Sequence, residues 1–328
     1  MKSEDEIMAY IAGLMDGDGS FSIIKEKRMR GSIYSPCIQL SNVFEGMVKF
    51  LYDLFGGSLK KKSVQRLATK QQYVWNVRGF ESCSYFLNKV LPFLVLKKER
   101  AEFLLNFIDK FSPPKIEIGV DGRYLKKDIA EKGQESCHLR MQSFNNDCLV
   151  ADGYVAKQAI KNTEDSIFWS YLAGIMETEG SFSIRKNKPS HGSKVFKYNP
   201  LMQLSMATFE TMNHIRRNTC FGTICFPKAK TAQRGFVYKL SFGRISECIS
   251  VIKNILPFLR FKKETAEILL DFCENYSCIK NRRAGVPIEE LAYRESCYQK
   301  IIFLNKNGFN KPSLIDSETP KQGDEGQG

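Results

Sequence analysis

A long internal repeat constrains the fold of this chain more than any other feature of its sequence. The segment YIAGLMDGDGSFSI at residues 10–23 returns as YLAGIMETEGSFSI at residues 171–184, and LPFLVLKKERAE at residues 91–102 returns as LPFLRFKKETAE at residues 256–267. A repeat unit of about 140 residues is far longer than the period of about 20–50 residues found in solenoids, and it is long enough for a domain. The sequence therefore predicts two copies of one domain.

The repeat divides the chain into four parts. We place the first copy at residues 7–146 and the second copy at residues 167–308. Residues 147–166 match nothing in either copy, so we expect a connector there. Residues 309–328 are rich in Ser, Asp, Glu, Gly and Gln, a composition that is typical of a disordered tail.

Each copy alternates between helical and extended residue patterns. In the first copy, helical spacing of apolar residues over residues 6–16 ends at Gly17 and Gly19, and glycine is common at helix ends. The remaining patterns predict strands over residues 20–28, 33–41 and 71–78 and helices over residues 44–55, 80–91 and 97–111. The order helix, two strands, helix, two strands and further helices predicts an α+β fold with an antiparallel sheet in each half.

A large positive charge indicates an anionic partner. The chain has 49 Lys and Arg residues against 36 Asp and Glu residues, which gives a formal net charge of +13 and a pI near 9.2. An acidic membrane surface would also attract such a chain, but no apolar run approaches the ~20 residues that a membrane-spanning helix needs. The first residues lack the pattern of a secretory or import signal, so we expect the protein to act where it is synthesised, without a membrane partner.

Two acids lie at the end of the first helix of each copy, Asp16 and Asp18 in the first and Glu177 and Glu179 in the second. A single acid near a helix end usually lies in solvent or caps a neighbouring element. The same acids recur in both copies, with Asp in one and Glu in the other. This recurrence favours a role that depends on charge and on oxygen ligation.

Small residues on the same two helices predict that the acid pairs meet. Gly13 and Gly17 in the first copy, matched by Gly174 and Thr178 in the second, would let the two helices pack closely side by side. Each helix then delivers its last acid to the same place between the halves. Carboxylates brought together repel each other, and a hard divalent cation such as Mg²⁺ relieves that repulsion through oxygen ligands alone.

Residues 11–19, IAGLMDGDG, and residues 172–180, LAGIMETEG, resemble the nine-residue motif that names the LAGLIDADG homing endonucleases. Two such motifs at half-chain spacing, each followed by LPFL and two lysines, resemble the double-motif, monomeric and pseudo-symmetric members of that family. The resemblance spans nearly the whole chain apart from connector and tail. It implies two halves, each with an antiparallel sheet saddle and packed helices, and with the motif helices at the interface between the halves.

The same resemblance implies a function and a genetic setting. It implies a site-specific, Mg²⁺-dependent hydrolase that makes a double-strand break in a long, weakly palindromic DNA target, with other divalent cations able to substitute. It also implies an intron-encoded protein that acts as a monomer on double-stranded DNA. We therefore expect it in an organelle, mitochondrion or chloroplast, if its gene is organellar, and in a prokaryotic cytoplasm otherwise.

Metal ligands follow from the resemblance, residue by residue. In the family, the last acid of each motif binds the catalytic metal, which maps onto Asp18 and Glu179. The backbone carbonyls of Gly17 and Thr178 are the further ligands that we expect. The earlier acid of each pair keeps a structural or supporting role.

Two further pairs of catalytic residues follow in the same way. A basic residue just after the Pro-Phe-Leu block maps onto Lys97 and Lys262. A strand residue that organises the water network in the family maps onto Gln39 and Gln203. The alternatives are a solvent-exposed lysine at a helix start and, for the glutamines, ordinary DNA contact or support of the fold.

Strands supply the DNA contacts that the resemblance implies. In the family, two antiparallel sheets form a saddle over the major groove, and a two-stranded ribbon fits that groove. Alternation along the first strand directs Phe21 and Ile23 into the core and their neighbours toward the DNA. The side chains assigned to the DNA face are Ser20, Ser22, Ile24, Glu26, Arg28, Gln72, Asn76 and Arg78 in the first half, and Ser181, Ser183, Arg185, Asn187, Lys239 and Ser241 in the second.

Two other functions fit a chain with these motifs. An RNA-binding intron maturase, which would bind the host intron RNA, is the main alternative, and a protein with both nuclease and maturase activity stays open. A DNA-binding regulator of the same fold is the third reading. Neither a maturase nor a regulator needs both acids Asp18 and Glu179, so their joint presence favours the endonuclease.

Overall fold

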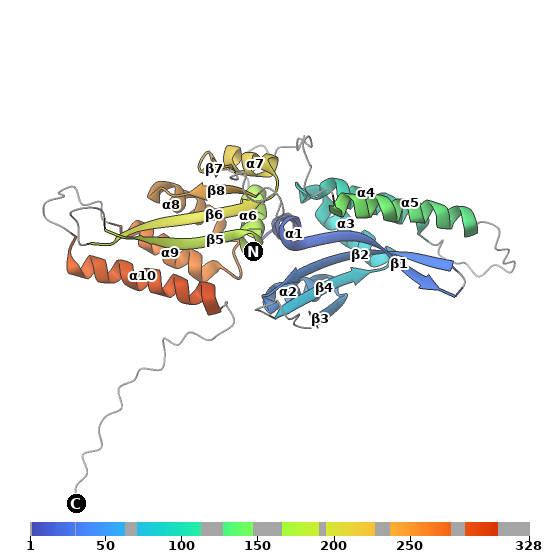
Figure 1. Ribbon diagram of the computed structural model, residues 1–328, viewed down its shortest axis with the longest axis horizontal. Coiled ribbons are helices and arrows are strands. Elements are labelled where there is room, and N and C mark those ends of the chain that lie inside the picture. The colour runs from blue at the N-terminus through green and yellow to red at the C-terminus, as the bar shows by residue number, and fades with distance from the viewer. Residues whose placement is uncertain are drawn as a thin grey trace, which may run out of the picture.

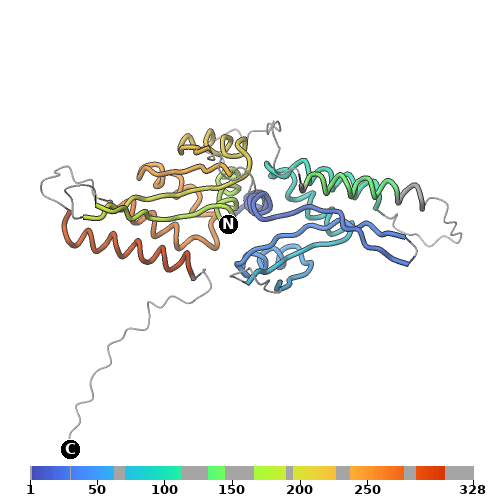
Figure 2. The backbone as a smooth tube through the Cα atoms, in the orientation of Figure 1, coloured from blue at the N-terminus to red at the C-terminus, as the bar shows by residue number. Residues whose placement is uncertain are grey.

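Two similar units lie side by side and meet along one helix from each (Figure 1, Figure 2). The computed structural model describes residues 2–29, 31–62, 71–112, 127–146, 166–189, 195–226, 237–276 and 286–307. The predicted tail lies outside the described residues, and so does the predicted connector apart from its last residue.

Apart from one short 3₁₀ helix in the first half, the two halves contain the same elements in the same order. The first half has α1 (Glu4–Asp18), β1 (Gly19–Arg28), β2 (Gly31–Asn42), α2 (Glu45–Phe55), β3 (Ser58–Lys62), β4 (Gln72–Arg78), α3 (Phe80–Val90), the short 3₁₀ helix η1 (Leu91–Phe93), α4 (Lys98–Phe111) and α5 (Lys127–Asn146). The second half has α6 (Ser166–Thr178), β5 (Gly180–Asn187), β6 (Lys197–Met206), α7 (Phe209–Thr219), β7 (Thr223–Cys225), β8 (Tyr238–Phe242), α8 (Ile245–Ile255), α9 (Lys263–Glu274) and α10 (Ile288–Asn307). The predicted α+β class and its element order are confirmed.

Each half is built on a four-stranded antiparallel sheet, with strand orders β1-β2-β4-β3 and β5-β6-β8-β7. One face of the first sheet is apolar, because Phe21 pairs with Ile38, which pairs with Val77, and all three are buried. Helices α2 to α5 contact the strands of this sheet and cover that face. The other face has no helix over it in the described part of the chain (Figure 1). In the second sheet Phe182, Met202 and Phe242 pair in the same way and are all buried, so the core fills one side of each sheet.

Helix α1 starts earlier and ends later than the sequence predicts. It starts at Glu4 because Ser3 and Glu6 form a capping box, with Glu6 N–H donating to Ser3 Oγ at 3.1 Å and Ser3 N–H donating to Glu6 Oε2 at 2.9 Å. It runs through Gly17 and ends at Asp18, and Gly19 is its first non-helical residue. Gly17 thus lies inside the helix and does not terminate it.

The contact between α1 and α6 is close enough to require glycine on both sides. A Cβ atom on Gly13 would lie 2.2 Å from the carbonyl oxygen of Tyr171, and a Cβ atom on Gly174 would lie 2.1 Å from the carbonyl oxygen of Tyr10. Both distances are far below van der Waals contact. The two backbones therefore touch directly, and the predicted side-by-side packing of the motif helices is confirmed.

None of the helices in the described ranges combines the length and the apolar character that crossing a membrane would need.

The helix contact yields a stability prediction. Gly174→Ala places a methyl group against the rigid backbone at Tyr10, so we expect it to lower the free energy of unfolding by about 1–3 kcal/mol or more, the range typical of overpacking. Gly243→Ala is the matched control, because a Cβ there would meet no atom within 4 Å. Chemical denaturation measures both, and equal stability of the two variants would contradict this account of the interface.

Candidate active site

The last acids of the two motifs lie together at one end of the α1–α6 pair. Asp18 is the final residue of α1, and Glu179 directly follows α6. The helices are in register at this end, because a Cβ atom on Gly17 would lie 2.0 Å from Thr178 Oγ1. Both carboxylates are half-buried, and the charge of Asp18 raises the pKa of Glu179. The predicted metal ligands Asp18, Glu179, Gly17 and Thr178 are thus gathered in one place.

Burial and charge act against each other at the two acids. Loss of hydration raises the pKa of Asp18, while a hydrogen bond from Asn42 and the charges of Lys97 and Lys262 lower it. Loss of hydration is also the largest cause of the raised pKa of Glu179, followed by repulsion from Asp18. The protein therefore holds two carboxylates in a place where their charged forms are disfavoured.

The earlier acids, Asp16 and Glu177, bind backbone groups. Asp16 is buried, and its carboxylate accepts hydrogen bonds from the N–H groups of Val95 at 2.8 Å, Leu96 at 2.9 Å and Lys97 at 2.8 Å. These three residues form the turn that leads into α4, where Lys97 is the N-cap. Asp16 thus positions that turn, which is the structural role expected of the earlier acids.

Glu177 does the same in the second half. Its carboxylate accepts from the N–H groups of Arg260 at 2.7 Å, Phe261 at 2.8 Å and Lys262 at 2.9 Å. A tyrosine of the opposite half also approaches each earlier acid. Tyr171 Oη donates to Asp16 Oδ2 at 2.8 Å, and Tyr10 Oη donates to Glu177 Oε1 at 3.5 Å.

The two predicted basic residues lie near the acid pair, because the charges of both act on Asp18 and Glu179. The Lys97 Nζ atom donates to three carbonyl oxygens around the end of α1, those of Met15 at 2.9 Å, Gly17 at 2.8 Å and Gly19 at 2.6 Å. Lys262 Nζ donates to Met176 O at 3.0 Å and Gly180 O at 2.6 Å. These bonds set the ammonium groups against the negative ends of the motif helices.

The setting of Lys262 is strongly desolvated. Burial lowers its pKa, and the carboxylates of Glu177, Asp18 and Glu179 oppose that shift. Two ammonium groups thus face two half-buried carboxylates at the junction of the halves. This arrangement places opposite charges close together in a site that is partly shielded from water.

The predicted glutamines lie in polar rows on the uncovered sheet faces. Gln39 pairs with Ser20 on one side and Asn76 on the other, and its Nε2 atom donates to Ser41 Oγ at 3.0 Å. Gln203 pairs in the same way with Ser181 and Ser241, and its Nε2 atom donates to Ser241 Oγ at 2.8 Å. Each row crosses three strands and begins on the strand that directly follows the last acid of the motif.

The register places every residue assigned to DNA contact on the uncovered face of its sheet, because residues directly opposite each other in antiparallel strands share a face. Of these, Glu26, Arg28, Gln72, Arg78, Ser181, Arg185, Asn187 and Lys239 are exposed, and Ser20, Ser22, Ile24, Asn76, Ser183 and Ser241 are half-buried. Glu26 forms ion pairs with Arg78 at 3.7 Å and Arg28 at 3.9 Å.

The donor set fits a hard divalent cation. Within the described ranges no group of three or more His, Cys, Asp and Glu side chains is arranged to hold a metal ion, so the two carboxylates would need help from other oxygens. Carbonyl oxygens at the helix ends could supply them, since the Gly17 oxygen, which already accepts from Lys97, has a second lone pair. Oxygen-only ligation of this kind suits Mg²⁺ or Ca²⁺.

Sequence reasoning missed Asn42, the residue in direct contact with Asp18. Its Nδ2 atom donates to Asp18 Oδ2 at 2.6 Å. The residue at the matched position of the second copy is Met206. A search for residues that recur in both copies does not find Asn42, because the second copy has a different residue there. Its role is seen only in the structure, where the end of β2 lies beside the end of α1.

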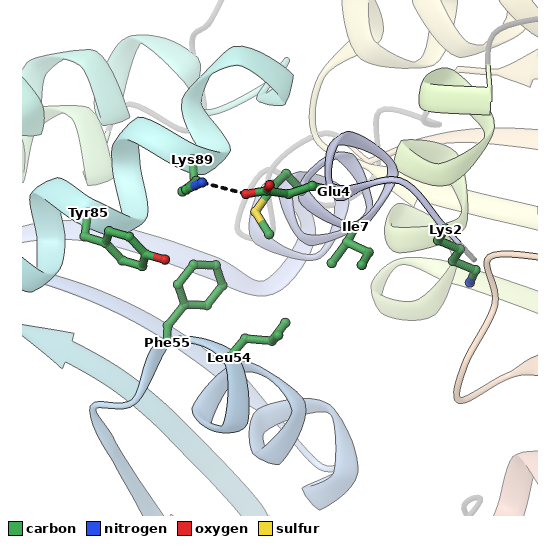
Figure 3. Close-up of a pocket in the computed structure, with 8 residues that line it drawn as sticks. Lys2, Glu4, Ile7, Leu54, Phe55, Tyr85 and Lys89 are labelled. Carbon is green, nitrogen blue, oxygen red and sulfur yellow. Dashed lines mark hydrogen bonds and ion pairs between the residues drawn. The ribbon is translucent and has the colours of Figure 1, made fainter.

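A cavity of about 380 Å³ lies at the other end of α1 (Figure 3). Glu4, Ile7 and Met8 line it from α1, and Lys89 of α3 forms an ion pair with Glu4 at 2.5 Å. Because α1 rises about 1.5 Å per residue, this cavity is about 20 Å from Asp18. It is therefore separate from the acid pair.

The raised pKa of Glu179 yields a prediction about stability. Because its folded-state pKa lies above the ordinary value of 4.5, this carboxyl stabilises the fold most when protonated, and the contribution is lost as the pH rises through the folded-state pKa. We therefore expect Glu179→Gln to raise the melting temperature at pH 7 without divalent cations. Below pH 4.5, where the native carboxyl is also protonated, the gain should disappear.

Asp16→Asn is the matched control for that measurement. It also removes one negative charge from a motif helix, but the new NH₂ group cannot accept a hydrogen bond, so at least one of the three backbone bonds to residue 16 is lost and the melting temperature should fall. A lower melting temperature for Glu179→Gln, comparable to that of Asp16→Asn, would contradict the electrostatic account of the site.

Comparison with known sequences finds one distant relative and no matching family model. The chain is 26% identical over 205 residues to a probable intron-encoded endonuclease, aI3, of Debaryomyces hansenii. The match covers 57% of this chain and 28% of that protein. The chain therefore spans little more than a quarter of the length of this relative.

Comparison with solved structures finds the same architecture. The LAGLIDADG homing endonuclease I-GzeII in complex with its DNA target has a TM-score of 0.66, and the match covers 93% of this chain and 99% of that one at 14% identity. I-SmaMI bound to cleaved DNA has a TM-score of 0.61, covering 89% and 95% at 14% identity. I-SmaMI bound to uncleaved DNA in the presence of calcium ions has a TM-score of 0.62, covering 89% and 97% at 13% identity.

At this level of identity the likeness establishes the fold. With its paired motifs, its two four-stranded sheets and its motif helices packed at the interface, the chain has the fold of the double-motif LAGLIDADG homing endonucleases.

Proposed function

We propose that this protein is a site-specific DNA endonuclease that makes a double-strand break, with its cleavage centre at the junction of α1 and α6. The observation that carries the proposal is the meeting of Asp18 and Glu179 near Lys97 and Lys262. A regulator or an RNA-binding protein of this fold has no use for two half-buried carboxylates whose charged forms destabilise the fold.

Asp18 and Glu179, with the carbonyls of Gly17 and Thr178, would hold Mg²⁺ or another divalent cation. When bound, such an ion supplies Lewis acidity and an activated water for phosphodiester hydrolysis. The half-buried setting excludes part of the bulk water and strengthens the electrostatic interactions of every charge in the site. A bound cation would relieve the repulsion between the two carboxylates, and this relief would favour its binding.

In this mechanism Lys97 and Lys262 stabilise negative charge on the phosphate. Their ammonium groups are fixed by carbonyl oxygens of the motif helices, so they need no rearrangement to stabilise negative charge that develops on a phosphate above them. Gln39 and Gln203, one on each polar row, are placed to orient water or phosphate oxygens with their side-chain amides. Each half thus contributes one acid, one lysine and one glutamine.

The two uncovered sheet faces would bind the DNA. A two-stranded antiparallel ribbon fits the major groove, and the net charge of +13 favours a polyanion. The faces differ, since Ile24 and Glu26 of the first half match Arg185 and Asn187 of the second. Because unlike faces read unlike sequences, we propose a long and weakly palindromic target.

The genetic setting is also a proposal. The relative in Debaryomyces hansenii is described as intron-encoded, which supports an origin of this chain inside an intron. The target would then be the uninterrupted exon junction, and the protein would act as a monomer in the compartment that holds its gene.

We expect the purified protein with Mg²⁺ to linearise a plasmid that carries the exon junction of its host gene. Asp18→Asn or Glu179→Gln should abolish double-strand cutting and retain DNA binding, because each removes a metal ligand and leaves the sheet faces unchanged. Gel electrophoresis measures cutting, and fluorescence anisotropy measures binding. Undiminished cleavage by both variants would overturn the proposed centre.

Binding should weaken steeply with salt. Log affinity should fall linearly with log salt concentration, with a slope of about 0.9 for each phosphate contacted. Arg185→Gln, on the proposed DNA face, should reduce that slope by up to about one contact. Lys89→Gln, at the far end of α1 beside the cavity, is the control and should leave it unchanged. Equal slopes for the two variants would contradict the assignment of the face.

A further inference from the structure

The two halves hold their last acids differently. Asn42 Nδ2 donates to Asp18 Oδ2 at 2.6 Å. At the matched position of the second half, the side chain of Met206 has no N–H or O–H group to donate. Within the described part of the chain, no side chain donates a hydrogen bond to Glu179. The two acids therefore differ in their hydrogen-bond donors as well as in side-chain length.

The orientation of Asn42 is fixed independently of Asp18. Its Oδ1 atom accepts the backbone N–H of Phe44 at 2.8 Å, which leaves the NH₂ group to face the carboxylate. Asn42 is also the last residue of β2, where it pairs with Tyr73 of β4. A backbone ladder and a turn therefore hold this amide before any ligand arrives.

A contact from the second half supports the same turn. The ring centroids of Phe44 and Phe261 lie 5.0 Å apart, and the backbone N–H of Phe261 donates to Glu177. The matched residues on the other side of the molecule are Thr208 and Leu96, which lack a ring. The path from Glu177 through Phe261 and Phe44 to Asn42 thus exists on one side only.

We propose that Asn42 is a positioning residue that presets the Asp18 carboxylate and makes the two strand cleavages unequal. With Oδ2 held by the amide, Asp18 presents Oδ1 in one direction. Glu179 has one more rotatable bond and no such donor, so it loses more side-chain entropy when it is ordered. This inference rests on the proposed nuclease function and concerns the order in which the two strands are cut.

A first test follows each strand separately. A target duplex with different labels on its two strands is cut in single turnover, and we expect the unmodified protein to nick one strand faster than the other. Asn42→Met, which copies the second half, should slow the faster nick by about tenfold, the loss typical of one charge-assisted hydrogen bond. Met206→Asn is the matched control and should leave the faster nick unchanged.

A second test needs neither metal nor DNA. In the NMR spectrum of the metal-free protein, the side-chain amide protons of Asn42 report the bond to Asp18. Asp18→Asn should shift these signals, and Glu179→Gln should leave them in place. Asn42→Ser, which shortens the side chain and removes the amide, replaces Asn42→Met in the first test if the methionine variant does not fold.

The outcomes separate this inference from the nuclease itself. Equal nicking of both strands by the unmodified protein, or equal slowing of both nicks by Asn42→Met, would overturn the inference and leave the endonuclease standing. Amide signals of Asn42 that ignore Asp18→Asn would overturn it as well. A failure to cut either strand would overturn the proposed endonuclease, and the strand order with it.

Discussion

The direct backbone contact between α1 and α6 is the constraint on which the rest of the structure depends. Gly13 and Gly174 bring the two helices so close that a single methyl group would collide with a carbonyl oxygen. Because each helix continues directly into the first strand of its sheet, this one contact sets the distance between the acids and also the relation between the two sheets. The proposed binding surface and the proposed cleavage centre are therefore one geometric unit.

Four charged side chains determine the electrostatics at that contact. Two half-buried carboxylates face two lysines whose ammonium groups are fixed by helix carbonyls. The turns that carry the lysines are in turn fixed by Asp16 and Glu177 through three backbone hydrogen bonds each. The two acids of each motif therefore have different roles, although they are only two residues apart. The earlier acid binds the turn, and the later acid faces the site.

Much of this could be predicted from the sequence, because the duplication gave each pattern an internal check. The element order, the helix packing and the burial of Phe21 and Ile23 are confirmed. The end of α1 could not be placed from the sequence. Glycine is common at helix ends, but it is also required where two helices are in close contact, as at Gly17. Asn42 could not be found, because its role depends on the far end of β2 meeting Asp18, a contact that no local pattern encodes.

The exchange of tyrosines between the halves has a consequence for how such chains recombine. Tyr171 of the second half donates to Asp16, and Tyr10 of the first half donates to Glu177, so each half completes the buried hydrogen bonding of the other. A half transplanted from another duplicated chain could bring its own strand face, and with it a change in the proposed DNA preference. A half without a hydroxyl at this position would leave the buried acid of the other half without one hydrogen-bond donor, at a cost of about 1–3 kcal/mol. The two tyrosines thus define a compatibility condition for modular exchange, independent of what each module reads.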